Sequence, residues 1–183
     1  MAIVADTKDW TWVLDRPCNE CGLDTNSISA GDVAAMLRRS VTDWQGDLHR
    51  DDVRDRPDRS TWSPLEYGCH VRDVCRRFDD RLALMLTRDD PEFENWDQDA
   101  TAVSDRYGEQ DPATVAVELA EAAQTLAMHF DELHCEQWQR TGRRSDGARF
   151  TVDSFARYLV HDVVHHLHDI GTGTAEPDST RVG

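Results

Sequence analysis

Histidine residues gather near the C-terminal end of the chain, in the segment His161-Asp162-Val163-Val164-His165-His166-Leu167-His168-Asp169. His161 and His165 stand four positions apart in a stretch with helical apolar spacing, so both rings project from one face of the expected helix. Imidazole is a good ligand for zinc and its first-row neighbours, and this spacing lets two rings reach one ion. The segment therefore predicts a metal site. For His166 and His168, a ligand role and an ordinary surface role both stay open.

A third ligand has to come from another part of the chain. His70 is the best-placed candidate, in the segment Glu66-Tyr67-Gly68-Cys69-His70-Val71-Arg72-Asp73. Three protein ligands that leave a coordination position open are typical of a catalytic metal rather than a structural one. The alternative is that these histidines are surface residues or hydrogen-bonded core residues.

The bulk properties bound the class of protein. A chain of 183 residues with 39% hydrophobic residues is long enough for one domain with a sizeable core. The formal net charge of -16 disfavours binding to nucleic acid and to anionic membrane surfaces. No apolar run reaches the ~18 residues of a membrane span, and the first residues do not form a signal peptide. We expect a cytoplasmic protein that acts on a small molecule, and a homodimer is compatible with this size.

Four amphipathic segments are expected to be helices that position these residues. They cover about 29–49, 63–87, 111–133 and 151–170. Ser63-Pro64-Leu65-Glu66 is a strong start signal, because it combines a capping serine, proline at the first position and a glutamate that closes a capping box. Strand signals are scarce. The pattern predicts an all-α fold, an up-and-down four-helix bundle.

The domain organisation follows from these segments. Residues 1–28 form an N-terminal extension, 29–170 the bundle, and 171–183 a tail that we expect to be disordered. The connection over residues 88–110 contains Phe93, Trp96 and Tyr107, and we expect it to be an ordered loop.

The chain has five cysteines, an odd number that argues against a disulfide framework. Cys18 and Cys21 form a Cys-x-x-Cys motif. Such a motif is half of a zinc site or a redox pair, and no second pair follows it, so a structural or incidental role also stays open. For the other three cysteines the simplest interpretation is a small buried side chain: Cys69, Cys75 and Cys135.

One family resemblance joins these observations. The segments that carry it are Trp62-Ser63-Pro64-Leu65-Glu66-Tyr67-Gly68-Cys69-His70-Val71-Arg72-Asp73 and Tyr158-Leu159-Val160-His161-Asp162-Val163-Val164-His165-His166. Their order and spacing resemble the DinB-like superfamily of metal-binding four-helix bundles, which includes the mycothiol-dependent maleylpyruvate isomerases and related bacterial thiol transferases. The resemblance implies that His70, His161 and His165 bind a divalent ion, zinc or nickel, with water in the open positions.

The resemblance also suggests a function. We expect a metal-dependent S-transferase that joins a low-molecular-weight thiol of the mycothiol type to small electrophiles. The isomerase has a C-terminal domain with no counterpart in these 183 residues, so isomerase activity itself is not implied. The alternative is a non-enzymatic, stress-related bundle with a structural ion.

Several further residues have two possible roles. Three aspartates could orient the imidazoles or simply be solvated: Asp73, Asp162 and Asp169. The segment 96–99 could fold over the mouth of the bundle and contact substrate, or only pack against it. Arg143 and Arg144 could bind a substrate carboxylate or be solvated loop residues.

Overall fold

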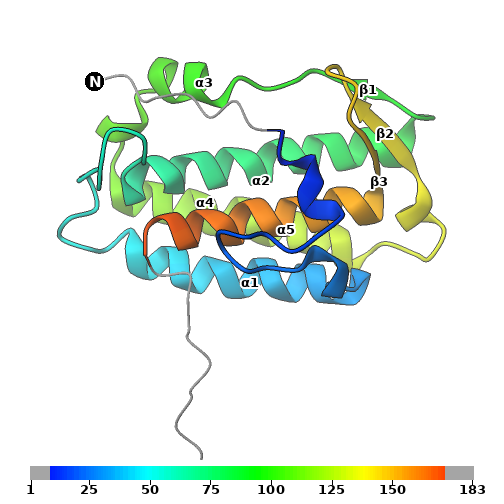
Figure 1. Ribbon diagram of the computed structural model, residues 1–183, viewed down its shortest axis with the longest axis horizontal. Helices are drawn as coiled ribbons and strands as arrows, with labels where there is room; N and C mark the ends of the chain where they lie inside the picture. The colour runs from blue at the N-terminus through cyan, green and yellow to red at the C-terminus, as the bar shows by residue number, and fades with distance from the viewer. Residues whose placement is uncertain (1–8, 172–183) are drawn as a thin grey trace, which may run out of the picture.

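The computed structural model describes residues 9–171. Four long helices form a bundle: α1 (Ala30–Asp47), α2 (Pro64–Thr87), α4 (Pro112–Asp131) and α5 (Val152–Asp169) (Figure 1). The predicted four-helix bundle is confirmed. The predicted disordered tail lies outside the described residues, apart from Gly171.

The four helices begin where the sequence predicts. Their N-cap residues are Ser29, Ser63, Asp111 and Thr151. At the start of α2 the amide of Ser63 donates to Glu66 Oε2 at 3.0 Å, and the Glu66 amide donates to Ser63 Oγ at 3.3 Å. These bonds satisfy backbone donors that have no partner within the helix, which fixes the start of α2 seven residues before His70.

α1 and α2 lie across one diagonal of the bundle, and α4 and α5 lie across the other, whereas α2 and α4 are neighbours. α1 packs mainly against α4 and α5, and so does α2. Along α2 and α4, Arg72 pairs with Glu118, and Asp79 pairs with His129 further on. Since both partners advance together, these two helices run parallel, and the long connection between them returns along the bundle (Figure 1).

The helices α2 and α5 run antiparallel, and their contact includes His70, one of the three predicted histidine ligands. Phe78 of α2 stacks on Phe155 of α5 with ring centroids 4.2 Å apart. Two turns earlier on α2, His70 meets the later residues Asp162 and His166 of α5. The apolar pair and the polar cluster therefore belong to one interface.

The connection after α2 is ordered, as predicted, but it is not a plain loop. It contains β1 (Glu92–Phe93), α3 (Gln98–Ser104) and the 3-10 turn η3 (Tyr107–Glu109). β1 pairs in parallel with β2 (Thr141–Arg144), which pairs antiparallel with β3 (Arg149–Thr151). Strands of this length carry too little periodicity to be recognised in the sequence.

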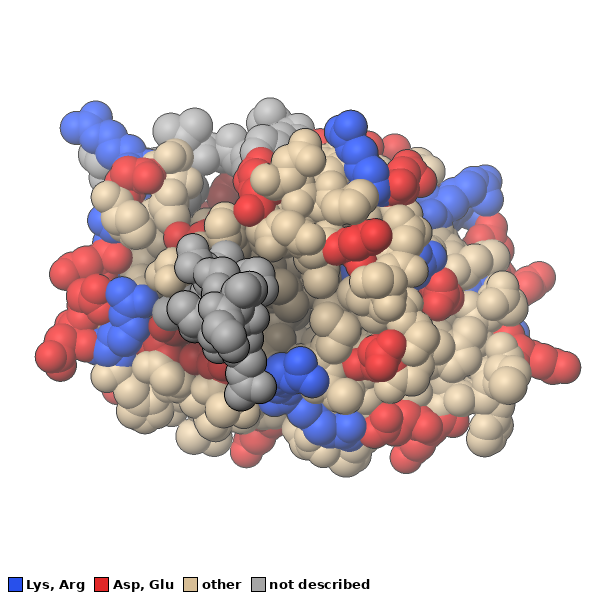
Figure 2. Space-filling view, turned by 60° about the horizontal axis from the view of Figure 1, so that its bottom comes forward, with Lys and Arg blue, Asp and Glu red and all other residues tan. Residues whose placement is uncertain are grey.

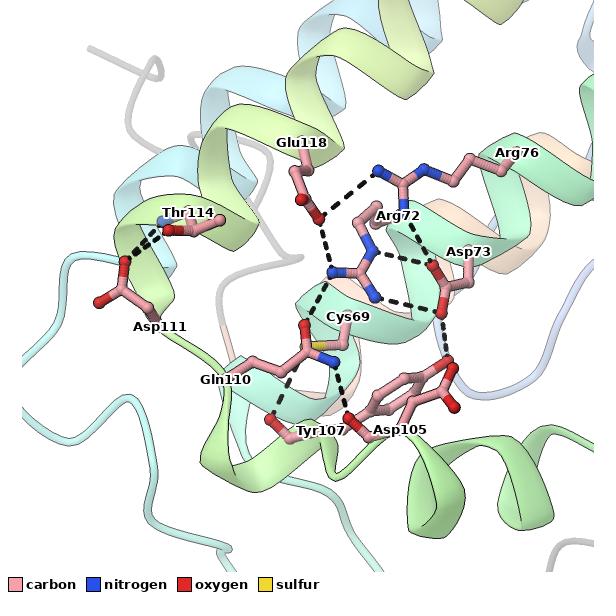
Figure 3. Close-up of polar contacts among 10 residues, drawn as sticks. All are labelled: Cys69, Arg72, Asp73, Arg76, Asp105, Tyr107, Gln110, Asp111, Thr114 and Glu118. Atoms are coloured by element: carbon pink, nitrogen blue, oxygen red, sulfur yellow. Dashed lines mark hydrogen bonds and ion pairs between the residues drawn. The ribbon is translucent and has the colours of Figure 1, made fainter.

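A polar network ties this connection to α2 and α4 (Figure 3). The guanidinium of Arg72, buried on α2, donates to Asp73, to Glu118 of α4 and to the Gln110 side chain. The Tyr107 hydroxyl donates to Asp73 Oδ2 at 2.6 Å. Asp73 therefore does not orient the histidines, because its carboxylate is bound by Arg72, Tyr107 and Arg76.

The described part of the N-terminal extension packs on the bundle. The 3-10 turns η1 (Trp10–Leu14) and η2 (Thr25–Ser27) both contact α5. Cys69 and Cys75 are buried as predicted. The same prediction is wrong for Cys135, which is exposed because it lies beyond α4, just before the turn η4 (Gln137–Gln139).

Two surface properties complete the description. Among residues 9–171, no helix is both long enough and apolar enough to cross a membrane. Acidic side chains are spread over the visible face of the molecule, with basic ones between them (Figure 2). This distribution agrees with the excess of 36 acidic over 20 basic residues in the chain.

Candidate metal centre

Two groups of metal-ligating side chains lie side by side on α5. One group contains His70, Asp162 and His166. The other contains Cys18, Cys21, His161 and His165. Within each group the donor atoms lie within 4.8 Å of one another. We call these the histidine–aspartate group and the cysteine–histidine group.

The periodicity of a helix explains why α5 serves both groups. His161 and His165 share one face, and Asp162 and His166 share the next, because each pair is spaced by four residues. The first face turns toward the N-terminal extension and the second toward α2.

The histidine–aspartate group is centred on a deeply buried imidazole. His70 is 1% exposed, and neither of its ring nitrogens has a hydrogen-bond partner. Its Nε2 lies 3.7 Å from Asp162 Oδ2, an atom that is likewise buried without a hydrogen bond. Buried polar atoms are rarely left unsatisfied in proteins. These orphaned atoms facing one another fit the donor set of a metal ion.

A second carboxylate orients the other histidine of this group. His166 Nδ1 donates to Asp169 Oδ2 at 3.0 Å, which leaves Nε2 directed at Asp162 Oδ1 at 3.7 Å. Metal-binding histidines commonly donate their second nitrogen to a carboxylate in this way. Asp169 is therefore a positioning residue, one of the two roles that the sequence left open.

Aromatic rings enclose His70. The Trp96 indole stacks on the imidazole with centroids 5.2 Å apart and planes 8° apart, and Trp62 packs against the ring at 5.4 Å. The Trp96 Nε1–H donates to Thr101 Oγ1 at 2.7 Å, and the Arg77 guanidinium lies over the outer part of the indole. This arrangement keeps bulk water away from His70.

The cysteine–histidine group joins the N-terminal extension to α5. Cys18 is 2% exposed, His161 3% and His165 5%. Cys18 Sγ lies 3.7 Å from His165 Nδ1, and His161 Nε2 is buried without a hydrogen bond. On the far side of the ring, His165 Nε2 faces Glu20 and Asp169 carboxylate oxygens, each at 3.6 Å.

Burial sets the protonation of these groups. Desolvation lowers the pKa of His161 to about 4, helped by the neighbouring His165, and desolvation also lowers the pKa values of His70 and His165. These imidazoles are therefore neutral at pH 7, the form that ligates metals. For Asp162 burial acts to raise the pKa, but His166 and His70 outweigh it and lower it to about 2, so the group is a carboxylate.

An open cleft of about 890 Å³ lies next to both groups. Trp96, which stacks on His70, forms part of its wall, and so does Trp10, whose ring packs against His165 at 4.7 Å. Tyr158 also lines it, one helical turn before Asp162. The segment 96–99 lines the cleft, so it stands at the mouth of the bundle as the sequence suggested.

The two loop arginines are placed differently from one another. Arg144 lines the cleft, where it pairs with Asp146 at 2.8 Å and lies near Tyr158. Arg143 pairs with Asp90 and Glu92, and it is not among the residues that line this cleft.

A comparison with family models decides the relationship. Residues 35–170 match the model of the DinB superfamily.

The chain belongs to the DinB superfamily.

A solved structure supports this assignment at the level of the fold. YfiT from Bacillus subtilis, described as a "probable metal-dependent hydrolase with an unusual four-helix bundle topology", superposes with a TM-score of 0.67 at 20% sequence identity. The superposition covers 78% of this chain and 86% of YfiT. A search of curated proteins gave no significant match.

The predicted ligands of this DinB-superfamily chain are divided between the two groups. His161 and His165 lie together, with the cysteine pair, whereas His70 lies with Asp162 and His166. Among residues 9–171, no group of donor atoms that lie within 4.8 Å of one another contains all three predicted histidines. A single ion bound by His70, His161 and His165 therefore stays a prediction.

Sequence reasoning gave less weight to Asp162 and His166. They have the same spacing of four residues as His161 and His165. Because one of the two positions is an aspartate, the pair does not form a His-x-x-x-His motif. Two histidines and one carboxylate are a known donor set for divalent metals.

Proposed function

We propose that this protein is a divalent-metal-dependent S-transferase that joins a low-molecular-weight thiol of the mycothiol type, through its sulfur, to small electrophiles. The observation that carries the proposal is the buried His70, whose unsatisfied Nε2 faces Asp162 and which lies in one donor group with His166, beside a cleft. These three residues would hold the ion. A zinc or nickel ion at such a site supplies a Lewis acid that lowers the pKa of a thiol or a water molecule.

The residues around the ion have defined tasks in this proposal. Asp169 holds the His166 ring through Nδ1, so that Nε2 is presented to the site. Trp96 and Trp62 exclude water from His70 and fix the plane of its ring. A dry site strengthens the electrostatic interactions within it.

The cleft wall indicates what kind of substrate fits. Tyr158 presents a hydroxyl beside the Arg144 guanidinium, a pair suited to donate hydrogen bonds to an oxygen of the substrate. Four aspartates line the same cleft: Asp9, Asp97, Asp99 and Asp146. Their negative charge favours neutral or cationic molecules over anions, and Arg144 is already paired with Asp146. Both substrates of the proposed reaction, the thiol and the electrophile, are therefore uncharged molecules.

Hydrolysis is a second candidate, and one observation favours it. YfiT, which has the same fold, is described as a probable metal-dependent hydrolase. A water molecule in place of the thiol would make the same site attack an ester or an amide.

The test compares the two reactions in one preparation. The zinc- or nickel-loaded protein is assayed for conjugation of cysteine or a sugar-linked thiol to monochlorobimane, and for hydrolysis of p-nitrophenyl acetate. We expect conjugation to exceed the uncatalysed rate and to fall at least about 100-fold in His70→Ala and His166→Ala. The exposed His134 provides the control His134→Ala, which should retain the wild-type rate.

Two other assay results would favour a different function. Hydrolysis without conjugation, lost in the same two variants, would favour the second candidate. Bound metal with neither reaction would support the non-enzymatic alternative, a bundle that carries a structural ion.

A further inference from the structure

The cysteine pair lies in a tight loop that turns both sulfur atoms toward α5. The Gly22 amide donates to the Cys18 carbonyl at 2.9 Å, and the Cys18 amide donates to the Leu23 carbonyl at the same distance. Gly22 has a φ of +76°, a conformation that glycine adopts without steric cost. The sequence Cys-x-x-Cys-Gly is therefore folded as a preformed chelating loop.

The opposite half of the site comes from the far end of the chain. His165 is separated from Cys18 by 147 positions, yet Cys18 Sγ lies 3.7 Å from His165 Nδ1. Tetrahedral zinc with Zn–S bonds of ~2.3 Å and Zn–N bonds of ~2.0 Å holds its sulfur and nitrogen ligands about 3.5 Å apart. The observed separation fits two ligands of one ion.

The remaining atoms complete the set. His161 Nε2 is more than nine-tenths buried and has no hydrogen bond, and its residue lies one turn before His165 on the same face of α5. All four donor atoms of the cysteine–histidine group lie within 4.8 Å of one another. Both cysteines are free thiols and do not form a disulfide in this arrangement.

From this geometry we propose a second metal site, in which Cys18, Cys21, His161 and His165 bind one zinc ion. Two sulfurs and two imidazole nitrogens are the ligands of many structural zinc sites, and four protein ligands leave no open position for substrate. Two thiolates also neutralise the charge of Zn²⁺, which suits a site formed by buried residues. The ion has a structural role that is distinct from the proposed catalytic ion.

This second site would clamp the N-terminal extension onto the bundle. Trp10 packs on the rings of both His161 and His165, and it also lines the cleft. The ion therefore fixes one wall of the cleft. Asp169 faces His165 Nε2 with one oxygen and His166 Nδ1 with the other, so a single carboxylate supports a ligand of each site.

Cobalt substitution tests the proposal, because thiolate ligands give Co(II) a charge-transfer absorption that nitrogen and oxygen ligands do not. The full-length protein is stripped of metal under reducing conditions and titrated with Co(II). We expect a thiolate-to-cobalt band and the intense visible bands of a tetrahedral ion, both saturating at one equivalent per chain. Cys18→Ser/Cys21→Ser should lose these bands and one equivalent of bound zinc, whereas Cys135→Ser, at an exposed cysteine, should keep both.

A measurement on the unmodified chain guards against misfolding of the double variant. In the zinc-loaded protein, Cys18 and Cys21 should resist iodoacetamide and become reactive when a chelator is added, while Cys135 reacts in both conditions. The proposal is overturned if the thiolate band is absent, if it survives in the double variant, or if both thiols react equally with and without chelator. None of these readouts measures turnover, so a failure of the second metal site can be distinguished from a failure of the proposed enzymatic activity.

Discussion

His165 and His166 are neighbours in the sequence, but they belong to different donor groups. Their ring centroids are 6.0 Å apart, with planes at 72°. His165 faces Cys18 of the N-terminal extension, and His166 faces Asp162 and the buried His70. One helix thus provides ligands for two sites on adjacent faces, and this division leads to the first prediction.

Alanine substitution at these two positions should affect different ions. We expect His165→Ala to weaken cobalt binding at the cysteine–histidine group and to shift its thiolate-to-cobalt absorption, because one imidazole ligand is lost while both thiolates remain. His166→Ala should keep that absorption and lose the other equivalent of cobalt. Absorption spectroscopy with elemental analysis measures both. Identical spectral changes in the two variants would contradict the division into two sites.

The Trp96 ring should control access to His70. Because the indole stacks on the imidazole, Trp96→Ala opens the histidine–aspartate group to water. Loss of such a supporting contact typically lowers metal affinity about 10-fold or more. Competition with a fluorescent chelator measures the affinity. Trp138→Ala is the matched control, since Trp138 stacks on Phe130 instead and should leave the affinity unchanged.

The Asp73 network should make stability depend on pH in the acid range. Burial acts to raise the pKa of Asp73, but Arg72 and the Tyr107 hydroxyl outweigh it, so the folded-state pKa lies below the ordinary value of 3.8. The unfolded chain then binds this proton more readily than the folded one. The stabilisation is therefore complete above about pH 4 and is lost as the pH falls through the lower, folded-state pKa.

Asp73→Asn tests this relationship. At pH 7 the variant should lose about 2–3 kcal/mol of the free energy of unfolding, the usual range for hydrogen bonds to a charged group. The difference from wild type should shrink as the pH is lowered below 4, and urea unfolding at several pH values measures it. Asp131→Asn, which removes an exposed partner of Arg38, should have a smaller effect. A gap between Asp73→Asn and wild type that is independent of pH would argue against the assigned role.

Two glycines should respond to alanine in opposite directions. At Gly142 of β2 an added Cβ would lie 2.8 Å from Met85 Cγ and 3.0 Å from a Phe93 ring carbon, so overpacking should cost about 1–3 kcal/mol. At Gly46, exposed on α1, nothing lies within 4 Å, and alanine should stabilise the helix by about 0.5–1 kcal/mol. Thermal unfolding measures both, and a stabilising Gly142→Ala would show that this contact is not tight.

The sequence by itself determined the helices. Ser63, Asp111 and Thr151 supply side-chain oxygens where backbone amides lack partners. At Ser29 the Asp32 carboxylate accepts from the Ser29 amide and hydroxyl. Local chemistry therefore fixes where each helix begins. Apolar spacing then fixes which face of each helix is buried. Both signals are encoded within a few residues, which is why the four-helix bundle and the histidine-bearing helix could be predicted.

The grouping of the ligands was decided only by the tertiary structure. Helical spacing states that His161 and His165 share a face and that Asp162 and His166 share the next, but not which segment each face meets. The N-terminal extension covers the first face and α2 covers the second, through contacts as distant in sequence as Cys18 and His165. Such contacts depend on how whole elements pack against one another. Local residue spacing along the chain therefore does not predict them.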